Sequence, residues 1–435
     1  MSRAWSLALP VVTVLVVTYA LLFAGVPRPV VGARVYGGPT EGVSRLSLRV
    51  EAVTRDGEHE APYWPGALRV TAGANNGALL GLTLTRAARG VADFELGFAA
   101  PIRGPVNLTV RDPAGSLLAA GPIALRLERW AARARRRGGW IRGRDAGGLV
   151  LSIAPERGAF VIGAEDALLI SVQQAGNAVS GARLTLSADG AELDLTQDLR
   201  TDQRGRARVR FRALALNPTV RIEARAADQT GLIDSGVPVV PGGFQALRTA
   251  TGARIESATP RTEAFCALVT DRGRVLGRAL ELTPDTRGGA WAAVDLPAPA
   301  EPAWLVVSSE VDENSIAAVG WPLTPSNEPA QTFDVPDALL LDGLPAAFAR
   351  EQARRAHVRW LTATFIALAF ALSVVLLVIR VRAADRNIAQ HLRADLELEA
   401  ASRIAPRRLL PLFGALLLLG LGFVLLGLIV AARAH

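Results

Sequence analysis

A basic and aromatic segment holds the residues of this chain that could most directly bind a charged partner. Between residues 126 and 144 the sequence contains eight Arg and two Trp. Guanidinium groups pair with phosphate and carboxylate, and indole rings attract cations and flat groups. We therefore expect contact with an anionic envelope component: lipid head groups, lipopolysaccharide phosphates or an acidic protein. The candidate contact residues are Arg129, Trp130, Arg133, Arg135, Arg136, Arg137, Trp140, Arg142 and Arg144.

The same segment is open to a second interpretation. It lies between two predicted domains, and a run of like charges repels itself and stays extended. On this interpretation the segment is a solvated linker or hinge. Nucleic acid would suit the chemistry but not the compartment predicted below.

No residue pattern in the chain predicts catalysis, a cofactor or a metal. His59 is the only His inside the predicted domains, and no G-x-S-x-G motif accompanies it, so a surface loop is favoured over a catalytic triad. Cys and His are too few for zinc, and the one dense acidic run, residues 310–314, is interpreted as a turn rather than a calcium site. The single Cys266 cannot form an intrachain disulfide, and its apolar neighbours predict burial. The chain is expected not to be an enzyme.

An internal repeat indicates how the soluble part is built. Three copies of Arg-Gly-x-Ala open extended runs at residues 89–96, 204–211 and 287–294. Gly tolerates the positive φ of a turn, and apolar residues at alternate positions indicate half-buried strands. A Gly-Ala pair precedes the first two copies by 23 residues, whereas Gly277 precedes the third by 10, so two similar modules and one shortened module are predicted. Helical periodicity is nearly absent before Ala346, which favours antiparallel β-sandwiches.

The second module resembles bacterial immunoglobulin-like and macroglobulin-like domains. The resemblance rests on residues 176–184 (GNAVSGARL) and 201–209 (TDQRGRARV) and covers residues 148–236. It implies an Ig-like binding or spacer unit. The thioester motif of macroglobulin inhibitors is missing, because Ala267, Leu268 and Val269 follow the only Cys, so that activity is not implied.

Three apolar stretches predict membrane segments. Residues 7–26, 361–379 and 409–430 are each close to the roughly 20 residues that cross a bilayer, and none contains a charged residue or His. The first is interpreted as an uncleaved anchor, with a signal peptide cleaved near residues 31–33 as the alternative. Seven Arg between residues 380 and 408 favour a cytoplasmic loop, although four Arg between 350 and 359 weaken this orientation. Residues 34–357 would then face the periplasm.

Small residues predict that the last two segments pack together. Ala363, Ala367 and Ala371 recur every four residues, and Gly420 and Gly427 lie two turns apart. Small faces allow close helix approach, but small residues facing lipid are an equal alternative. Because Pro406 and the last segment follow closely, the helix after residue 381 is expected to bend along the inner membrane surface. A folded-back pair of short helices is the alternative, although no Gly or Pro between residues 381 and 405 marks its turn.

Composition agrees with a bacterial origin and an attraction to anionic surfaces. All 48 basic residues are Arg, as a GC-rich bacterial genome would produce, and the net charge is a modest +8.

The predicted fold is mainly β: tandem Ig-like β-sandwich modules with one N-terminal and two C-terminal transmembrane helices. The predicted function is that of a bacterial inner-membrane protein whose periplasmic modules bind or scaffold an envelope protein or anionic polymer; the alternative is an adaptor subunit of a transport or secretion complex. The predicted organisation is an anchor or signal peptide (1–33), module 1 (34–127), an Arg/Trp-rich linker (128–147), module 2 (148–238), a shorter module 3 (239–325), a linker (326–357), a transmembrane helix (358–381), a cytoplasmic amphipathic helix (382–408) and a last transmembrane helix (409–435).

Overall fold

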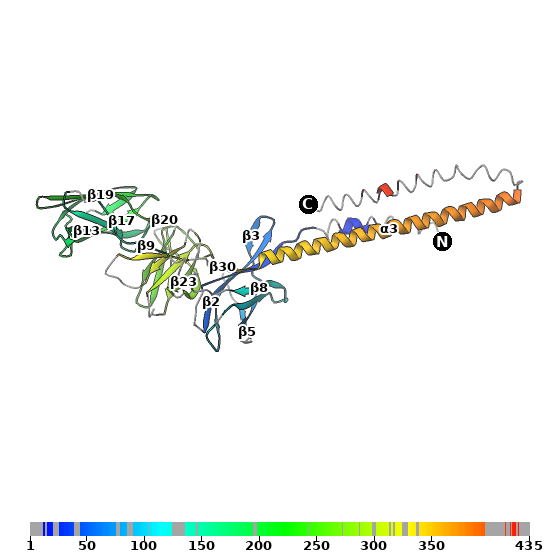
Figure 1. Ribbon diagram of the computed structural model, residues 1–435, viewed down its shortest axis with the longest axis horizontal. Coiled ribbons are helices and arrows are strands. Elements are labelled where there is room, and N and C mark those ends of the chain that lie inside the picture. Colours follow the sequence, from blue (N-terminus) through cyan, green and yellow to red (C-terminus); the bar gives the residue numbers. More distant parts are fainter. Residues whose placement is uncertain are drawn as a thin grey trace. The chain divides into compact units, whose positions relative to one another are not determined.

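The computed structural model divides the chain into two compact units (Figure 1). The β unit comprises residues 31–344, and the helical unit comprises residues 1–30 and 345–435. The structure describes residues 12–13, 15–20, 26–38, 44–74, 79–84, 90–102, 104–123, 135–144, 147–194, 198–241, 243–271, 273–286, 288–297, 302–312, 315, 318–323, 329–335, 339–395, 414, 418, 420–422 and 425.

Module 1 is a sandwich of two antiparallel sheets. One sheet has the order β3-β2-β1-β30, with β6 also paired to β2, and the other has the order β5-β4-β7-β8. Alternating apolar residues of both sheets, such as Leu48 and Val110, fill the core between them. The strands are β1 (Val30–Gly37), β2 (Arg45–Asp56), β3 (His59–Pro62), β4 (Leu68–Ala74), β5 (Leu79–Leu84), β6 (Val91–Gly97), β7 (Val106–Arg111), β8 (Leu117–Ile123) and β30 (Leu339–Asp342).

Module 2 is a second sandwich, with its own core around Phe160, Ile170 and Phe211. The order β10-β11-β13-β17-β16 forms one sheet, to which β14 adds, and β15-β18-β19 forms the other, while β12 and β20 make a short parallel pair. The strands are β10 (Ile141–Arg142), β11 (Val150–Pro155), β12 (Phe160–Val161), β13 (Glu165–Gln174), β14 (Asn177–Ala178), β15 (Arg183–Asp189), β16 (Ala191–Asp194), β17 (Arg206–Ala213), β18 (Thr219–Ala226), β19 (Gln229–Gly236) and β20 (Val239–Val240).

Module 3 packs the sheet β21-β22-β26-β25 against the wider sheet β24-β23-β27-β28-β29-β9. Its core includes Cys266 and Trp321, and the predicted burial of Cys266 is confirmed. The strands are β9 (Arg135–Gly138), β21 (Phe244–Arg248), β22 (Gly252–Ser257), β23 (Glu263–Thr270), β24 (Gly273–Glu281), β25 (Thr283–Pro284), β26 (Ala290–Asp295), β27 (Ala303–Ser308), β28 (Val319–Pro322) and β29 (Gln331–Asp334).

The modules are nested rather than strung in series. After β8 the chain adds β9 to module 3, builds module 2, returns to complete module 3, and then pairs β30 with β1 of module 1. Arg34 and Asp342 are partners in this closing pair. The predicted linkers 128–147 and 326–357 therefore contain paired strands, and module 3 is widened by β9 and β29 rather than shortened. The sequence pattern locates the strands themselves. Strands that are consecutive in sequence usually pair, so the pairing of strands far apart in sequence could not be predicted.

The repeat does what its pattern predicts. Gly90, Gly205 and Gly288 have φ angles of 80°, 68° and 88°. This is the left-handed conformation that Gly adopts without steric cost. The strands β6, β17 and β26 follow within two residues of these turns. The mainly β fold class is confirmed.

The helical unit contains one long helix, α3 (Leu344–Asp395). Among the described residues it is the only helix long and apolar enough to cross a membrane. The prediction of three such helices is thus supported for one segment; the first and third segments lie largely outside the described residues. The predicted bend after residue 381 is wrong as far as Asp395, because α3 continues unbroken and no Gly or Pro interrupts residues 381–395.

Candidate functional site

The Arg/Trp segment is divided between modules 2 and 3. Residues 135–138 form β9, whose partners on β29 run from Asp334 opposite Arg135 to Gln331 opposite Gly138. Arg142 lies in β10 of module 2, where it pairs with Ser152. Arg129, Trp130 and Arg133 lie outside the described residues. The described part of the segment is therefore built into two sheets, which differs from a free linker.

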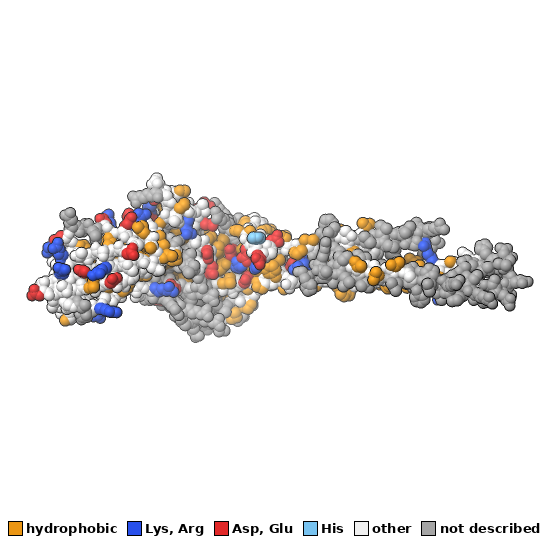
Figure 2. Space-filling model, turned by 90° about the horizontal axis from the view of Figure 1, so that it is seen from above, with side chains coloured by type: hydrophobic (Ala, Val, Ile, Leu, Met, Phe, Trp, Pro, Cys, Tyr) orange, Lys and Arg blue, Asp and Glu red, His pale blue; other side chains and the backbone are white. Residues whose placement is uncertain are grey.

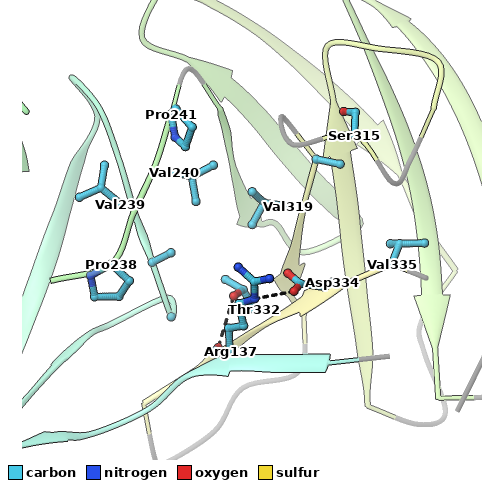
Figure 3. Close-up of a pocket in the computed structure, with 13 residues that line it drawn as sticks. Arg137, Pro238, Val239, Val240, Pro241, Ser315, Val319, Thr332, Asp334 and Val335 are labelled. Atoms are coloured by element: carbon cyan, nitrogen blue, oxygen red, sulfur yellow. Dashed lines mark hydrogen bonds and ion pairs between the residues drawn. The ribbon is translucent and has the colours of Figure 1, made fainter. Parts of the chain in front are cut away.

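A cavity of about 370 Å³ lies where modules 2 and 3 meet (Figure 3). Arg137 reaches into it from β9 and forms an ion pair with Asp334. Thr332 donates a hydrogen bond to the carbonyl oxygen of Arg137, at 3.3 Å. The rest of the lining is mostly apolar: Gly158, Ala159, Pro238, Val239, Val240, Pro241, Ser315, Ala318, Val319 and Val335.

Trp140 and Arg142 lie at the outer face of the module 2 sheet. The strand registers align four residues in one row across β10, β11, β13 and β17: Arg142, Ser152, Ser171 and Arg206. Directly opposed residues point to the same face of a sheet. The guanidinium of Arg206 lies 5.8 Å from the centroid of the Trp140 ring. Trp140 and Arg142, two predicted contact residues, thus share this face with Arg206. From the sequence, Arg206 is interpreted only as part of the structural repeat.

Other Arg side chains of module 2 are neutralised by neighbours. Arg208 pairs with Glu156 at 2.8 Å, Arg210 with Asp194 at 3.6 Å and Arg212 with Glu192 at 3.5 Å. On the face drawn in Figure 2, basic and acidic side chains are likewise interspersed over the β unit. Arg142 and Arg144 are exposed, and within the described part of the chain neither forms an ion pair or hydrogen bond.

A buried ion cluster joins modules 1 and 3. Asp93 on β6 accepts from Arg49 on β2 at 2.9 Å and from Arg274 on β24 at 3.1 Å. Both Arg side chains are fully buried. Arg49 also donates to the carbonyl oxygens of Cys266 and Arg278 in module 3, and Arg274 donates to Ser47 in module 1. Sequence reasoning missed this cluster, because a charged residue at an alternate strand position predicts solvent exposure.

The junction of modules 2 and 3 is held differently. Phe160 of β12 packs in the core of module 2, whereas the adjacent Ala159 and Val161 pack in the core of module 3. Successive side chains of a strand point to opposite faces, so one short strand serves two cores.

Asp166 is a buried carboxyl close to this junction. Its Oδ1 accepts from the amide of Ala167 at 2.7 Å and lies 3.8 Å from Arg157 Nη1. Asp166 Oδ2 and Arg157 Nη1 are buried and form no hydrogen bond within the described part of the chain. Burial raises the pKa of Asp166 to about 6, against the opposing effect of the Arg157 charge.

The residues considered for catalysis or metal binding do not form a site in the described part of the chain. His59 begins β3 and is exposed. The described residues contain no group of three or more His, Cys, Asp or Glu arranged to hold a metal. Of the acidic run 310–314, residues 313 and 314 lie outside the described part.

The small residues of α3 lie on its exposed side. Ala363, Ala367 and Ala371 are exposed, whereas the buried side chains of this stretch are Thr362, Ile366 and Ala369. A Cβ built on Gly420 would lie 3.8 Å from the Phe370 ring, so the two segments approach each other there. Gly427 lies outside the described residues.

At the start of α3, Glu351 gathers several donors. It accepts two hydrogen bonds from Arg354, at 2.8 and 2.7 Å, and one from the backbone amide of Arg28. Arg354 also donates to the carbonyl oxygen of Val26. These contacts tie residues 26–28 to α3 within the helical unit.

No family model and no curated protein matches this chain. Solved structures similar to it include a tetra-tandem repeat from the extending region of a large adhesion protein, at 9% identity over 72% of this chain and 74% of that one, with a TM-score of 0.18. Invasin, a bacterial integrin-binding protein, is similar at 11% identity over 70% of this chain and 59% of that chain, with a TM-score of 0.17. The D0-D1 domain of intimin is 14% identical over 48% of this chain and all of that one, with a TM-score of 0.16. These scores are low, so fold and function are argued from the molecule itself.

Proposed function

We propose that this chain is a non-enzymatic protein of the bacterial inner membrane whose β unit binds or scaffolds an anionic component of the envelope. The observation that carries the proposal is the placement of the Arg/Trp segment. Strand pairing holds Arg137 and Arg142 on two neighbouring modules. The charge of Arg142 is thereby presented at a fixed position, whereas Arg137 is paired with Asp334. Fixed charges lose less conformational entropy on binding than charges on a free linker.

Anchoring in the membrane is part of the proposal. The apolar face of α3 supports it: Leu368, Leu372 and Val375 are exposed along the helix, as lipid contact requires. A periplasmic position for the β unit follows from the distribution of Arg around the apolar segments.

A second candidate function is an adaptor subunit of a transport or secretion complex. The exposed stripe of Ala363, Ala367 and Ala371 favours it, because small residues on a membrane helix permit close approach of another helix. Simple tethering would not need such a stripe.

In-cell photocrosslinking distinguishes the two functions. A photoreactive residue at position 136 should yield an envelope product if the β unit binds or scaffolds. The same residue at position 367 should yield a membrane protein if the chain is an adaptor subunit. Position 254, an exposed residue of β22 in module 3, is the control. Products from position 136 no different from those of position 254 would refute binding through the Arg/Trp segment.

Replacing residues 358–435 with an unrelated membrane anchor provides the complementary test. Binding by the β unit should survive the exchange, because no residue assigned to binding lies in the replaced part. Loss of the associated phenotype with retention of binding would favour the adaptor function. A catalytic activity that is lost in His59→Ala would instead support an enzymatic role.

A further inference from the structure

We propose that Arg183, Arg200 and Arg225 form an anion site on the outer face of module 2, and that this site binds a phosphomonoester group of an envelope component. The inference rests on the proposed function, because it takes the partner to be anionic. It adds a second contact site and the class of the anion. These three residues are called the arginine row below.

Strand pairing brings the three residues of the arginine row together. In the sheet β15-β18-β19, Arg183 of β15 lies directly opposite Arg225 of β18. On the other side of β15, Arg200 forms an antiparallel bridge with Arg183, and backbone hydrogen bonds of 2.9 and 3.1 Å between the adjacent residues flank this bridge. Directly opposed residues point to the same face of a sheet at a separation of about 5 Å. The three guanidinium groups therefore start from neighbouring positions on one face.

The core of module 2 fixes this arrangement. The inward-facing partners on the same two strands, Leu184 with Ala224 and Leu186 with Ile222, lie in the module 2 core. A shift of register by one residue would move these apolar side chains to the solvent face. Like charges directly opposite each other are unfavourable. The arginine row thus keeps a repulsive pairing that the strands cannot relieve by sliding.

The arginine row carries more positive charge than its neighbours neutralise. Within the described part of the chain, Asp198 is its only ion-pair partner, at 3.3 Å from Arg183 and 2.9 Å from Arg200. Arg225 is exposed and forms no ion pair or hydrogen bond with any described residue. Residues 195–197, which precede Asp198 outside the described part, contain no charged side chain. Three Arg and one Asp leave two positive charges.

Other Arg side chains on the surface of module 2 differ from the arginine row. On the opposite sheet, one carboxylate pairs with each of three Arg: Arg208, Arg210 and Arg212. On β18 itself, Glu223 pairs with Arg221 at 3.2 Å. Each of these cations has a carboxylate of its own, whereas three cations of the arginine row share one. An anionic partner is therefore attracted most strongly to the arginine row.

A phosphomonoester matches the arginine row in charge and in acceptor number. At pH 7 it carries about 1.5 to 2 negative charges on three strong acceptor oxygens, so it balances two positive charges and can accept from several guanidinium groups. A carboxylate brings one charge and two oxygens, which Asp198 already supplies. The side chains of Arg183 and Arg200 are 69% and 57% exposed, so they are accessible to such a group despite their contact with Asp198.

Calorimetric titration of the full chain in a non-ionic detergent tests the proposal. The probes are phosphorylated dextran, carboxymethyl dextran of the same charge density, neutral dextran and inorganic phosphate. We expect phosphorylated dextran to bind about fivefold more tightly than carboxymethyl dextran, because phosphate makes more charge-assisted hydrogen bonds. Neutral dextran should not bind. Inorganic phosphate should compete with phosphorylated dextran, since the phosphate group is the part recognised.

Three variants assign the binding to the arginine row. Arg225→Gln should weaken binding of phosphorylated dextran about fivefold. Arg210→Gln is the matched control: it removes the same charge from an exposed position on the opposite sheet and should weaken binding less than about twofold. Asp198→Asn should instead strengthen binding about threefold, because it releases Arg183 and Arg200 and adds net positive charge. A gain in binding cannot result from misfolding.

Several results would overturn the arginine row. These are equal losses in Arg225→Gln and Arg210→Gln, no gain in Asp198→Asn, no competition by inorganic phosphate, or carboxymethyl dextran binding as tightly as phosphorylated dextran. If no probe binds while position 136 still crosslinks an envelope product, the arginine row fails and the proposed function stands. If phosphorylated dextran binds as expected while position 136 yields the products of position 254, the arginine row stands and binding through the Arg/Trp segment fails.

Discussion

The two junctions of module 3 differ in how they join the neighbouring domains. Toward module 1, the buried Arg49, Asp93 and Arg274 form a polar cluster whose hydrogen bonds cross the boundary. Toward module 2, Ala159 and Val161 insert apolar side chains, and a cavity of about 370 Å³ remains beside Ala159. Among the described residues, the hydrogen bonds across this boundary are made by neutral groups to backbone oxygens, from Gln245 to Glu165 and from Ala330 to Glu156, with no buried ion pair among them. Directional hydrogen bonds specify one geometry, whereas apolar contact and open space tolerate change. We infer that the first junction is the rigid one and that the second is where adjustment occurs.

The largest effect is expected at the polar junction, from Asp93→Asn. The substitution leaves two buried guanidinium groups without their shared carboxylate, which should cost about 3 to 5 kcal/mol. Hydrogen exchange of the β2 and β24 amides in the full chain measures the loss. Asp198→Asn is the control, because Asp198 pairs with Arg200 at an exposed position and should cost less than about 1 kcal/mol. Equal losses in the two variants would contradict a polar lock.

Gly277→Ala tests the same junction without changing a charge. A Cβ at this position would collide with Arg274 Nη2 and lie 2.5 Å from Asp93 Oδ1. Displacing these groups should cost about 2 to 3 kcal/mol, measured by the same exchange experiment. Gly97→Ala is the matched control, since a Cβ there would meet nothing within 4 Å. Unchanged exchange in Gly277→Ala would show that the cluster is not closely packed.

Asp166→Asn tests how the stability of the region near the junction of modules 2 and 3 depends on pH. Because the pKa of Asp166 is raised to about 6 in the folded state, its favourable contribution is complete below about pH 4 and is lost as pH rises through about 6. Arg157 opposes the shift, with smaller effects from Glu156 and Arg208. The ionised carboxyl should thus cost up to about 3 kcal/mol at pH 7, and Asn should remove this dependence. Urea unfolding between pH 4 and 8 measures it, with the exposed Asp194→Asn as control; parallel pH profiles of wild type and Asp166→Asn would contradict the prediction.

The smallest effect is expected from Ala318→Val at the apolar junction. Ala318 lines the cavity, which has room for two added methyl groups. Stability should change by less than about 0.5 kcal/mol, because no close contact is forced. Thermal unfolding of the full chain measures it. A loss of the size expected for Gly277→Ala would mean that both junctions are equally tight.

Local features were predictable from the sequence, and long-range pairing was not. The turns at Gly90, Gly205 and Gly288 followed from residue type and alternation, and so did the burial of Cys266. The nesting of the modules did not, because pairing β9 with β29 joins residues almost 200 positions apart without a distinctive pattern. The partners of Arg49 and the row that links Arg142 to Arg206 depend on strand register, which residue types alone do not specify.

Hydrogen exchange across residues 135–142 of the full chain tests the central claim, that the Arg/Trp segment is a fixed part of modules 2 and 3. The account predicts that the hydrogen-bonded amides of β9 and β10 exchange much more slowly than those of the exposed turn at residues 57 and 58. Exchange of residues 135–142 at the rate of an unstructured peptide would contradict it, and would return this segment to the role of a linker.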